Sequence, residues 1–132
     1  MTGLSTGAVA WLQGRGIDPE VADRLGLETA PGRGGEVIAF PFVRDGMVVR
    51  RKYRRLGEGA GPKWWQDEGE EQTAFNEDCL RDDSLIGQPV IITEGEADCV
   101  AAIQAGFPRS LSVPGGAPKD PTDEADLYDG KR

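Results

Sequence analysis

The second half of the chain has the hydrophobic pattern of a strand, a turn and a helix. Residues 90–98 begin with strand-forming side chains and end in a glycine turn that has acids on both sides. Small residues at helical spacing follow over 97–105, and Gly106 ends that pattern. A second strand is expected over 109–113. Two strands joined by one helix predict a parallel, right-handed βαβ unit, and ligands gather beyond the carboxyl ends of such strands.

The middle of the chain has the pattern of a β-hairpin. An apolar, β-prone run at 37–43 is followed by Asp45-Gly46, a strong hairpin turn signal, and by a returning strand at 47–55. Pro41 cannot donate a backbone hydrogen bond, so it indicates an edge or a bulge.

Shorter helical patterns come before the hairpin. An apolar run at 8–12 begins one helix, and 18–25 begins another, with Asp18 at the N-cap and proline at the first helical position. Together they predict a helical hairpin for packing or docking. The glycine-rich stretch 31–35 indicates a linker or turn rather than a phosphate loop, because no helix follows it. Residues 73–80 indicate a short strand or turn entering a helical turn.

Composition excludes several classes of chemistry. The 132 residues carry a net charge of −8, two cysteines and no histidine. A zinc ribbon, a histidine general base and a catalytic triad are therefore excluded, and any bound metal must have oxygen ligands. The chain has neither a signal peptide pattern nor an apolar run of membrane-spanning length. We expect a cytoplasmic protein with reduced thiols and no membrane partner.

Three acids alternate at the end of the predicted strand at 90–93. Glu94 lies where the strand stops, so its carboxylate can serve a hard cation or act as a general acid or base. Asp98 lies in the first helical turn, where the helix dipole alone gives it a structural reason to exist. Glu96 is expected to be exposed.

Positive charge is concentrated in the returning strand of the hairpin. Between Arg44 and Arg55 there are six basic residues and one acid. This pattern fits a contact with a phosphate backbone, and it equally fits a solvated edge strand that resists aggregation. Lys63 lies beside Trp64 and Trp65, which could stack on nucleobases or form a hydrophobic clamp.

Residues 90–117 resemble the first half of a Toprim domain, the catalytic fold shared by bacterial primases, topoisomerases and some nucleases. The acidic motif looks most like that of the phage-type primase–helicases. The Toprim match lies at 91–98, 101–106 and 112–116, and upstream 11–30, 38–53, 63–64 and 75–76 are similar to the preceding parts of a primase core.

This resemblance implies a magnesium- or manganese-dependent nucleotidyltransferase of DNA replication, without zinc, that makes RNA primers. It implies that Glu94 is catalytic and that Glu94 and Asp98 hold the metal. Its partners would be a single-stranded DNA template, nucleotides and a replicative helicase. The implied nucleic-acid residues are Arg50, Arg51, Lys52, Arg54, Arg55 and Lys63, and the implied supporting loop residues are Gly95, Gly115 and Gly116.

The sequence departs from the Toprim pattern after residue 113. A complete Toprim domain has a later strand ending in Asp-x-Asp, which is absent here, and Asp123, Asp126 and Asp129 lie in a polar stretch. We therefore expect an N-terminal piece of a longer primase-like protein that is inactive alone. The alternatives are a nucleic-acid- or replisome-binding module without catalysis, and a Toprim nuclease- or topoisomerase-like protein.

The fold class expected from these patterns is mixed, α+β with an α/β part. We expect a helical segment and linker at 1–34, a β-rich primase-core-like subdomain at 35–88, the first half of a Toprim domain at 89–118 and a flexible polar tail at 119–132.

Overall fold

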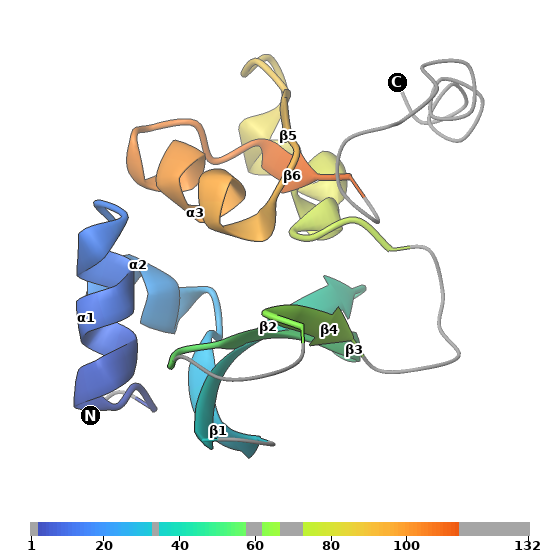
Figure 1. Ribbon diagram of the computed structural model, residues 1–132. Helices are drawn as coiled ribbons and strands as arrows, with labels where there is room; N and C mark the ends of the chain where they lie inside the picture. Colours follow the sequence, from blue (N-terminus) through green and yellow to red (C-terminus); the bar gives the residue numbers. More distant parts are fainter. Residues whose placement is uncertain (1–2, 33–34, 58–61, 67–72, 114–132) are drawn as a thin grey trace.

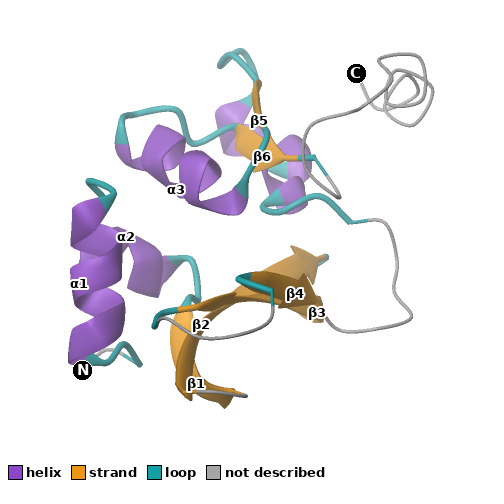
Figure 2. Cartoon of the chain, in the orientation of Figure 1, coloured by secondary structure: helices purple, strands orange, loops and turns teal. Residues whose placement is uncertain are grey.

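The computed structural model describes residues 3–32, 35–57, 62–66 and 73–113. Within them the chain forms an α+β fold with a four-stranded antiparallel sheet and a two-stranded parallel sheet, as predicted (Figures 1 and 2). The elements in order are α1 (Thr6–Gly14), α2 (Pro19–Arg24), β1 (Glu28–Gly32), β2 (Gly35–Arg44), β3 (Met47–Arg55), β4 (Trp64–Gln66), the 3-10 turns η1 (Glu77–Arg81) and η2 (Asp83–Leu85), β5 (Ile91–Thr93), α3 (Glu96–Gln104) and β6 (Ser110–Ser112).

Side-chain caps start both N-terminal helices. The Ser5 hydroxyl accepts from the Ala8 N–H at the start of α1, and Asp18 accepts from the Glu20 N–H at the start of α2. A cap of this kind stabilises a helix by about 1 kcal/mol. The prediction from Asp18 and Pro19 is confirmed.

The hairpin of β2 and β3 is also confirmed. Asp45 and Gly46 both have positive φ, 53° and 79°, as a tight hairpin turn that follows the twist of its strands requires. The strands pair from Val37 opposite Arg55 to Arg44 opposite Met47, with a bulge after Phe42. β4 extends the sheet on the other side of β3.

The strand β1 was not predicted. Glu28–Gly32 contains proline and glycine, which have low strand propensity, yet it pairs antiparallel with β2. This pairing requires a residue without a side chain at position 32, because a Cβ on Gly32 would lie 2.6 Å from Val37 Cγ1 and 3.6 Å from the Trp65 ring. Tertiary packing therefore makes a strand where local propensity is weak.

The predicted βαβ unit is present as β5, α3 and β6, with parallel strands. Gly106, at φ 104°, follows the end of α3 as expected. Phe75 forms an antiparallel bridge to Ser112, so the segment before η1 covers the other side of β6. Figure 1 shows this unit above the antiparallel sheet, with α1 and α2 beside both.

One apolar cluster joins the helices, the sheet and the βαβ unit. It includes residues of α1, α2, β2 and α3, and Phe75 packs edge-to-face on both Phe40 and Phe42. This cluster joins β2 to α3 through Cys99 and Val100, whereas Leu111 of β6 belongs to a second, smaller cluster with Ala74 and Cys79.

Polar contacts add two links at the margins of this core. Asp78 on η1 accepts from the N–H groups of Asp45 and Gly46, at 2.9 and 3.0 Å, and so holds the hairpin turn. Gln104 at the end of α3 accepts from the Asp18 N–H and donates to the Gly16 carbonyl. In the described ranges, no helix is long and apolar enough to cross a membrane.

Candidate functional site

The turn between β5 and α3 presents two carboxylates to solvent. β5 ends at Thr93 and α3 begins at Glu96, so Glu94 and Gly95 form the turn, and Glu94 and Asp98 are both exposed. The Thr93 hydroxyl donates to the Gly95 carbonyl at 2.9 Å, and the Cys99 N–H donates to the same oxygen. We call Glu94, Gly95 and Asp98 the acidic corner.

The prediction that Glu96 is exposed is wrong. Its side chain is 2% exposed, and its Oε1 lies 2.8 Å from Lys52 Nζ in an ion pair with β3. The Ser112 hydroxyl donates to Oε2 at 2.9 Å. A buried carboxylate is tolerated only when it is paired and hydrogen-bonded, and here each oxygen has a partner.

The acidic corner has the donor type that Mg²⁺ or Mn²⁺ prefers, but few donors. Carboxylate oxygens suit these hard cations, and Gly95 leaves the Asp98 carboxylate close to the turn, with Oδ2 3.8 Å from the position a Cβ would take. Among the described residues no group of three or more acidic, cysteine or histidine side chains converges. A cation held by Glu94 and Asp98 would take its remaining ligands from waters or substrate phosphates. Gly115 and Gly116 lie outside the described residues.

Strand alternation separates the predicted basic surface into two faces. Arg50, Lys52 and Arg54 pair across the sheet with Phe42, Phe40 and Ile38 of the core, whereas Arg51 and Arg55 alternate with them. Because successive side chains point to opposite faces, the five basic residues do not form one patch.

Two of the predicted nucleic-acid residues are buried, and we withdraw them from that surface. Arg50 is 6% exposed, lies 3.9 Å from the Phe42 ring centroid and donates to the Thr73 carbonyl at 2.8 Å. Arg55 is also 6% exposed and donates to the Gly57 carbonyl. Both guanidinium groups satisfy backbone carbonyls, so their role is to hold the sheet to the segments beside it.

The core-side face instead carries a row in which cations and indole rings alternate. In order it runs Arg15, Trp11, Arg54, Trp64, Lys52, and we call it the basic–aromatic row. Each cation lies within 6 Å of a ring centroid, the range of cation–π attraction: 3.9 Å for Arg15 over Trp11, 5.4 and 5.8 Å for Arg54 over the two rings, and 5.3 Å for Lys52 over Trp64. Lys52 also forms an ion pair with Glu96, so the row ends at the first residue of α3, one position after Gly95.

Sequence reasoning missed Trp11 and Arg15 as members of this row. The available signal was that Arg15, the C-cap of α1, follows Trp11 by four residues, because side chains at i and i+4 lie on one side of a helix. The two neighbouring tryptophans have different roles. Trp64 packs between Trp11 and Phe40, whereas Trp65 stacks on Tyr53 on the opposite face, with ring centroids 5.9 Å apart. The predicted hydrophobic clamp is thus confirmed for Trp64.

Arg51 and Lys63 are exposed and stay candidates for nucleic-acid contact. Arg51 lies in the middle of β3 and Lys63 immediately before β4, where its carbonyl accepts from the Arg55 N–H.

The two cysteines are structural. Cys79 Sγ and Cys99 Sγ lie 3.7 and 3.3 Å from the same acceptor, the Ser110 carbonyl. Burial raises the pKa of the Cys79 thiol to about 11 and also raises the pKa of the Cys99 thiol. Since the thiolate is the reactive form, neither residue is suited to be a nucleophile near neutral pH.

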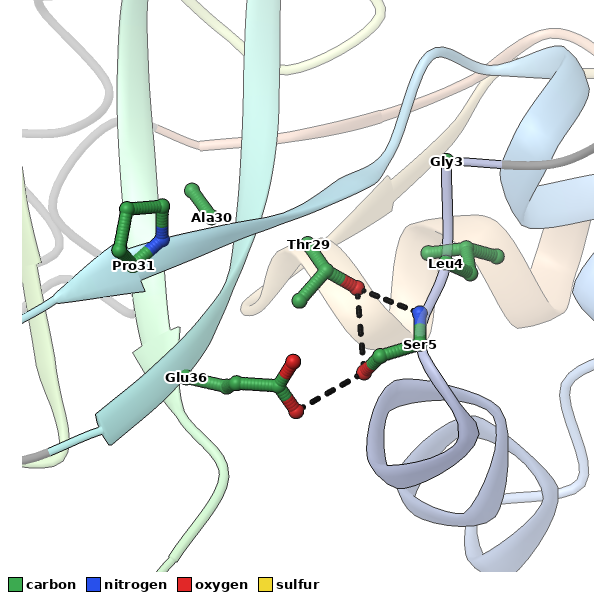
Figure 3. A pocket seen from close by; sticks show the side chains of 7 residues that line it. All are labelled: Gly3, Leu4, Ser5, Thr29, Ala30, Pro31 and Glu36. Atoms are coloured by element: carbon green, nitrogen blue, oxygen red, sulfur yellow. Dashed lines mark hydrogen bonds between the residues drawn. The ribbon is translucent and has the colours of Figure 1, made fainter.

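A hollow of about 500 Å³ lies away from the acidic corner, between the start of α1 and strands β1 and β2 (Figure 3). The Ser5 N–H donates to the Thr29 hydroxyl oxygen, and the Ser5 hydroxyl donates to the Glu36 carboxylate at 3.0 Å. These bonds connect the N-cap residue of α1 to the sheet, so they have a structural explanation.

Comparison with known proteins finds similarity to primases in sequence and in fold. No family model matches the sequence. The Primase homolog protein of Arabidopsis thaliana is 37% identical over 83 residues, which are 63% of this chain and 22% of that protein. The chloroplastic/mitochondrial Twinkle homolog protein of the same plant is 37% identical over 82 residues, 62% of this chain and 10% of that protein. The chain thus spans about a fifth and a tenth of these relatives.

Solved structures show the same fold. The Aquifex aeolicus primase, with its zinc-binding and RNA polymerase domains, matches 96% of this chain and 40% of its own, with a TM-score of 0.75 and 19% identity. The RNA polymerase domain of the Mycobacterium tuberculosis primase DnaG, in complex with a double-stranded DNA oligomer with a 6-nucleotide overhang, matches 85% of this chain and 48% of its own, with a TM-score of 0.69 and 19% identity. The described fold is therefore that of part of a primase catalytic core.

Proposed function

We propose that this chain is the N-terminal part of a primase-type catalytic core that holds single-stranded nucleic acid beside a metal-binding acidic corner. The observation that carries the proposal is the contact between Lys52, at the end of the basic–aromatic row, and Glu96, which follows directly after Gly95 of the acidic corner. Similarity to primase and Twinkle homologues, and the DNA bound in the M. tuberculosis structure, support the same class of ligand.

The basic–aromatic row supplies the positive charge of a single-strand surface. Arginine side chains attract the phosphate backbone, and the indole rings packed against the core hold these cations in place. Arg15 is exposed at the end of α1, so it is placed to meet a phosphate, while Trp11 and Trp64 are half-buried and hold Arg54 between them. The row would bind with little sequence preference, because contacts to phosphates carry no direct sequence information.

The acidic corner would hold Mg²⁺ or Mn²⁺ through Glu94 and Asp98. A bound divalent cation would stabilise the charge on attacking and leaving oxygens in phosphoryl transfer. Glu94 and Asp98 would orient it, while Lys52 keeps Glu96 out of the ligand set. Synthesis of RNA primers from nucleotides, with a helicase as partner, is the activity we propose for the longer protein to which such a core would belong.

A binding module without catalysis is the second candidate function. It is favoured by the small number of carboxylates, since within the described ranges no third acid joins Glu94 and Asp98. The two candidates share nucleic-acid binding and differ in whether the acidic corner takes a metal.

Binding of a fluorescent single-stranded oligonucleotide tests the shared part. We expect Arg15→Met to weaken binding and to reduce the slope of log affinity against log salt by about 0.7, the value for one phosphate contact on a single strand. Arg24→Met is the matched control, because Arg24 is an exposed arginine near the end of α2 outside the row. Equal effects of the two variants would remove the row from the proposal.

Broadening of NMR signals by Mn²⁺ separates the two candidates. If the acidic corner binds metal, Mn²⁺ should broaden the amide signal of Gly95 first, and Glu94→Gln should abolish that selectivity. Glu20→Gln, which neutralises an exposed acid at the start of α2, is the control. A wild-type chain whose Gly95 signal is no more sensitive than that of Glu20 would leave only the binding module.

A further inference from the structure

Glu96 occupies an unusual position for the first residue of a helix. Acids at helix N-termini commonly face solvent, where they interact with the helix dipole. Here the carboxylate turns inward and is 2% exposed. Its two oxygens are held by different elements: Lys52 of β3 at 2.8 Å and Ser112 of β6 at 2.9 Å. One side chain therefore connects the antiparallel sheet, α3 and the parallel sheet.

Lys52 is fixed from several sides. It lies in the middle of β3, opposite Phe40 on β2 and Gln66 on β4. Its side chain is 19% exposed, and Nζ lies 5.3 Å from the Trp64 centroid. A lysine on a solvated surface is mobile, whereas this one has a carboxylate on its ammonium group and an indole nearby.

The short backbone between Glu96 and Glu94 makes the position of Glu94 depend on the position of Glu96. Only Gly95 separates them, and its carbonyl accepts from both the Thr93 hydroxyl and the Cys99 N–H. A displacement of the first turn of α3 would therefore displace Glu94. The two other polar links described above lie elsewhere, at Gln104 on the far end of α3 and at Asp78 beside the hairpin turn. Neither holds the end of α3 that carries the acidic corner.

We propose that Glu96 is the positioning residue of the acidic corner, and that its buried pair with Lys52 sets the distance and angle between Glu94 and the basic–aromatic row. The functional meaning of this Glu96–Lys52 pair rests on the proposed function above. Phosphoryl transfer needs the metal and the phosphate-binding groups at a fixed separation, because a misplacement of about 1 Å can cost about 100-fold in rate. In this arrangement the ion pair of Lys52 and Glu96 fixes α3 on the antiparallel sheet. Lys52 is therefore not a phosphate ligand, and Glu96 is not a metal ligand.

The first experiment measures how the Glu96–Lys52 pair positions α3 over the sheet, in the absence of metal and nucleic acid. A nitroxide is attached at Ala105→Cys, an exposed site just after α3, and native Cys79 and Cys99 are buried and escape labelling. Relaxation enhancement of the β3 amides then reports the position of α3 over the sheet. Glu96→Gln and Lys52→Met should change the enhancement at Lys52 and Tyr53 by about twofold, while the amide shifts of β1 remain those of the parent. Glu20→Gln should leave both unchanged.

Unchanged enhancement in both variants would overturn the proposal. If Glu96→Gln does not fold, Ser112→Ala, which removes one hydrogen bond and keeps the ion pair, supplies the same comparison with a smaller change. Lys52→Arg, which can still pair with Glu96, should restore the parental pattern. Failure of that rescue alongside a loss of fold in both charge variants would show a role in stability only.

The second experiment tests whether the Glu96–Lys52 pair is needed for the proposed function. In the wild type, Mn²⁺ should tighten binding of an oligodeoxythymidylate by about fivefold or more, a typical coupling between two sites. Glu96→Gln should lose this coupling and keep the affinity seen in EDTA. If the coupling survives in Glu96→Gln, the positioning role of Glu96 is contradicted. A wild type that binds neither probe would refute the proposed function, and the spin-label comparison would still decide whether Glu96 positions the corner.

Discussion

Neighbouring arginines on β3 give the sharpest test of how this strand is used. Arg50 is 6% exposed and holds the Thr73 carbonyl, whereas Arg51 is exposed on the opposite face. We predict that Arg50→Met destabilises the fold without changing the salt dependence of nucleic-acid binding. Arg51→Met should change the salt dependence of nucleic-acid binding and leave the stability of the fold unchanged.

The magnitude for Arg50 follows from its contacts. Methionine preserves the apolar stem but leaves the buried Thr73 carbonyl without its donor, which costs about 1–3 kcal/mol. Loss of the cation over the Phe42 ring, now 3.9 Å from its centroid, adds about 1 kcal/mol. The expected loss in the free energy of unfolding is therefore about 2–4 kcal/mol. That is a large part of the roughly 5–15 kcal/mol that stabilises a typical domain.

Urea unfolding followed by tryptophan fluorescence measures this loss. With a slope of about 1.5–2 kcal/mol per molar urea, the midpoint of Arg50→Met should fall by about 1–2.7 M. Arg51→Met should keep the free energy of unfolding within about 0.5 kcal/mol of the parent, as exposed substitutions do. In oligonucleotide titrations Arg51→Met should reduce the salt slope by about 0.7. An unchanged midpoint for Arg50→Met, or an equal drop for both variants, would refute the separation of β3 into a structural and a binding face.

Three further predictions concern the rest of the fold. Cys79 and Cys99 should react with a disulfide reagent at pH 8 far more slowly in the native chain than in urea. Burial raises both thiol pKa values, so stability should be intact below about pH 9 and fall as the pH rises toward 11, whereas fast native labelling would contradict this. Burial raises the pKa of Asp78, but hydrogen bonds from the hairpin turn and a nearby arginine outweigh it and lower that pKa below 3.8. The stability from Asp78 is therefore present above about pH 4 and lost on acidification, and Asp78→Asn should cost about 1 kcal/mol at pH 7 and less at pH 3, as acid-dependent urea midpoints would report. Gly32→Ala should destabilise the fold by about 1–3 kcal/mol, because its Cβ would overlap Val37 Cγ1, and a wild-type midpoint would show that β1 adapts.

Local patterns in the sequence were sufficient wherever neighbouring residues decide the structure. Asp18 with Pro19 starts α2, and Asp45 with Gly46 turns the hairpin, because caps and tight turns depend on a few adjacent residues. The strand–turn–helix around Glu94 was readable for the same reason. The resemblance of these segments to a primase core agrees with the fold found for the described residues.

Patterns of charge were insufficient for assigning roles on β3. The sequence shows a basic strand, but not which of its two faces meets the core. Arg50 is buried because Phe42 and Thr73, 8 and 23 residues away, surround it. The strand β1 likewise exists only because β2 pairs with it.

Glu96 marks most clearly where the sequence alone could not decide. Its neighbours Glu94 and Asp98 are exposed, and nothing in residues 94–98 indicates that Glu96 is the buried one of the three acids. The distinction comes from Lys52, 44 residues earlier, and Ser112, 16 residues later, which meet the carboxylate only after both sheets have packed. The sequence determines which residues can be charged, capped or turned, because those properties are local. Burial and pairing depend on partners distant in the chain, so only the tertiary structure could decide that Glu96 is internal.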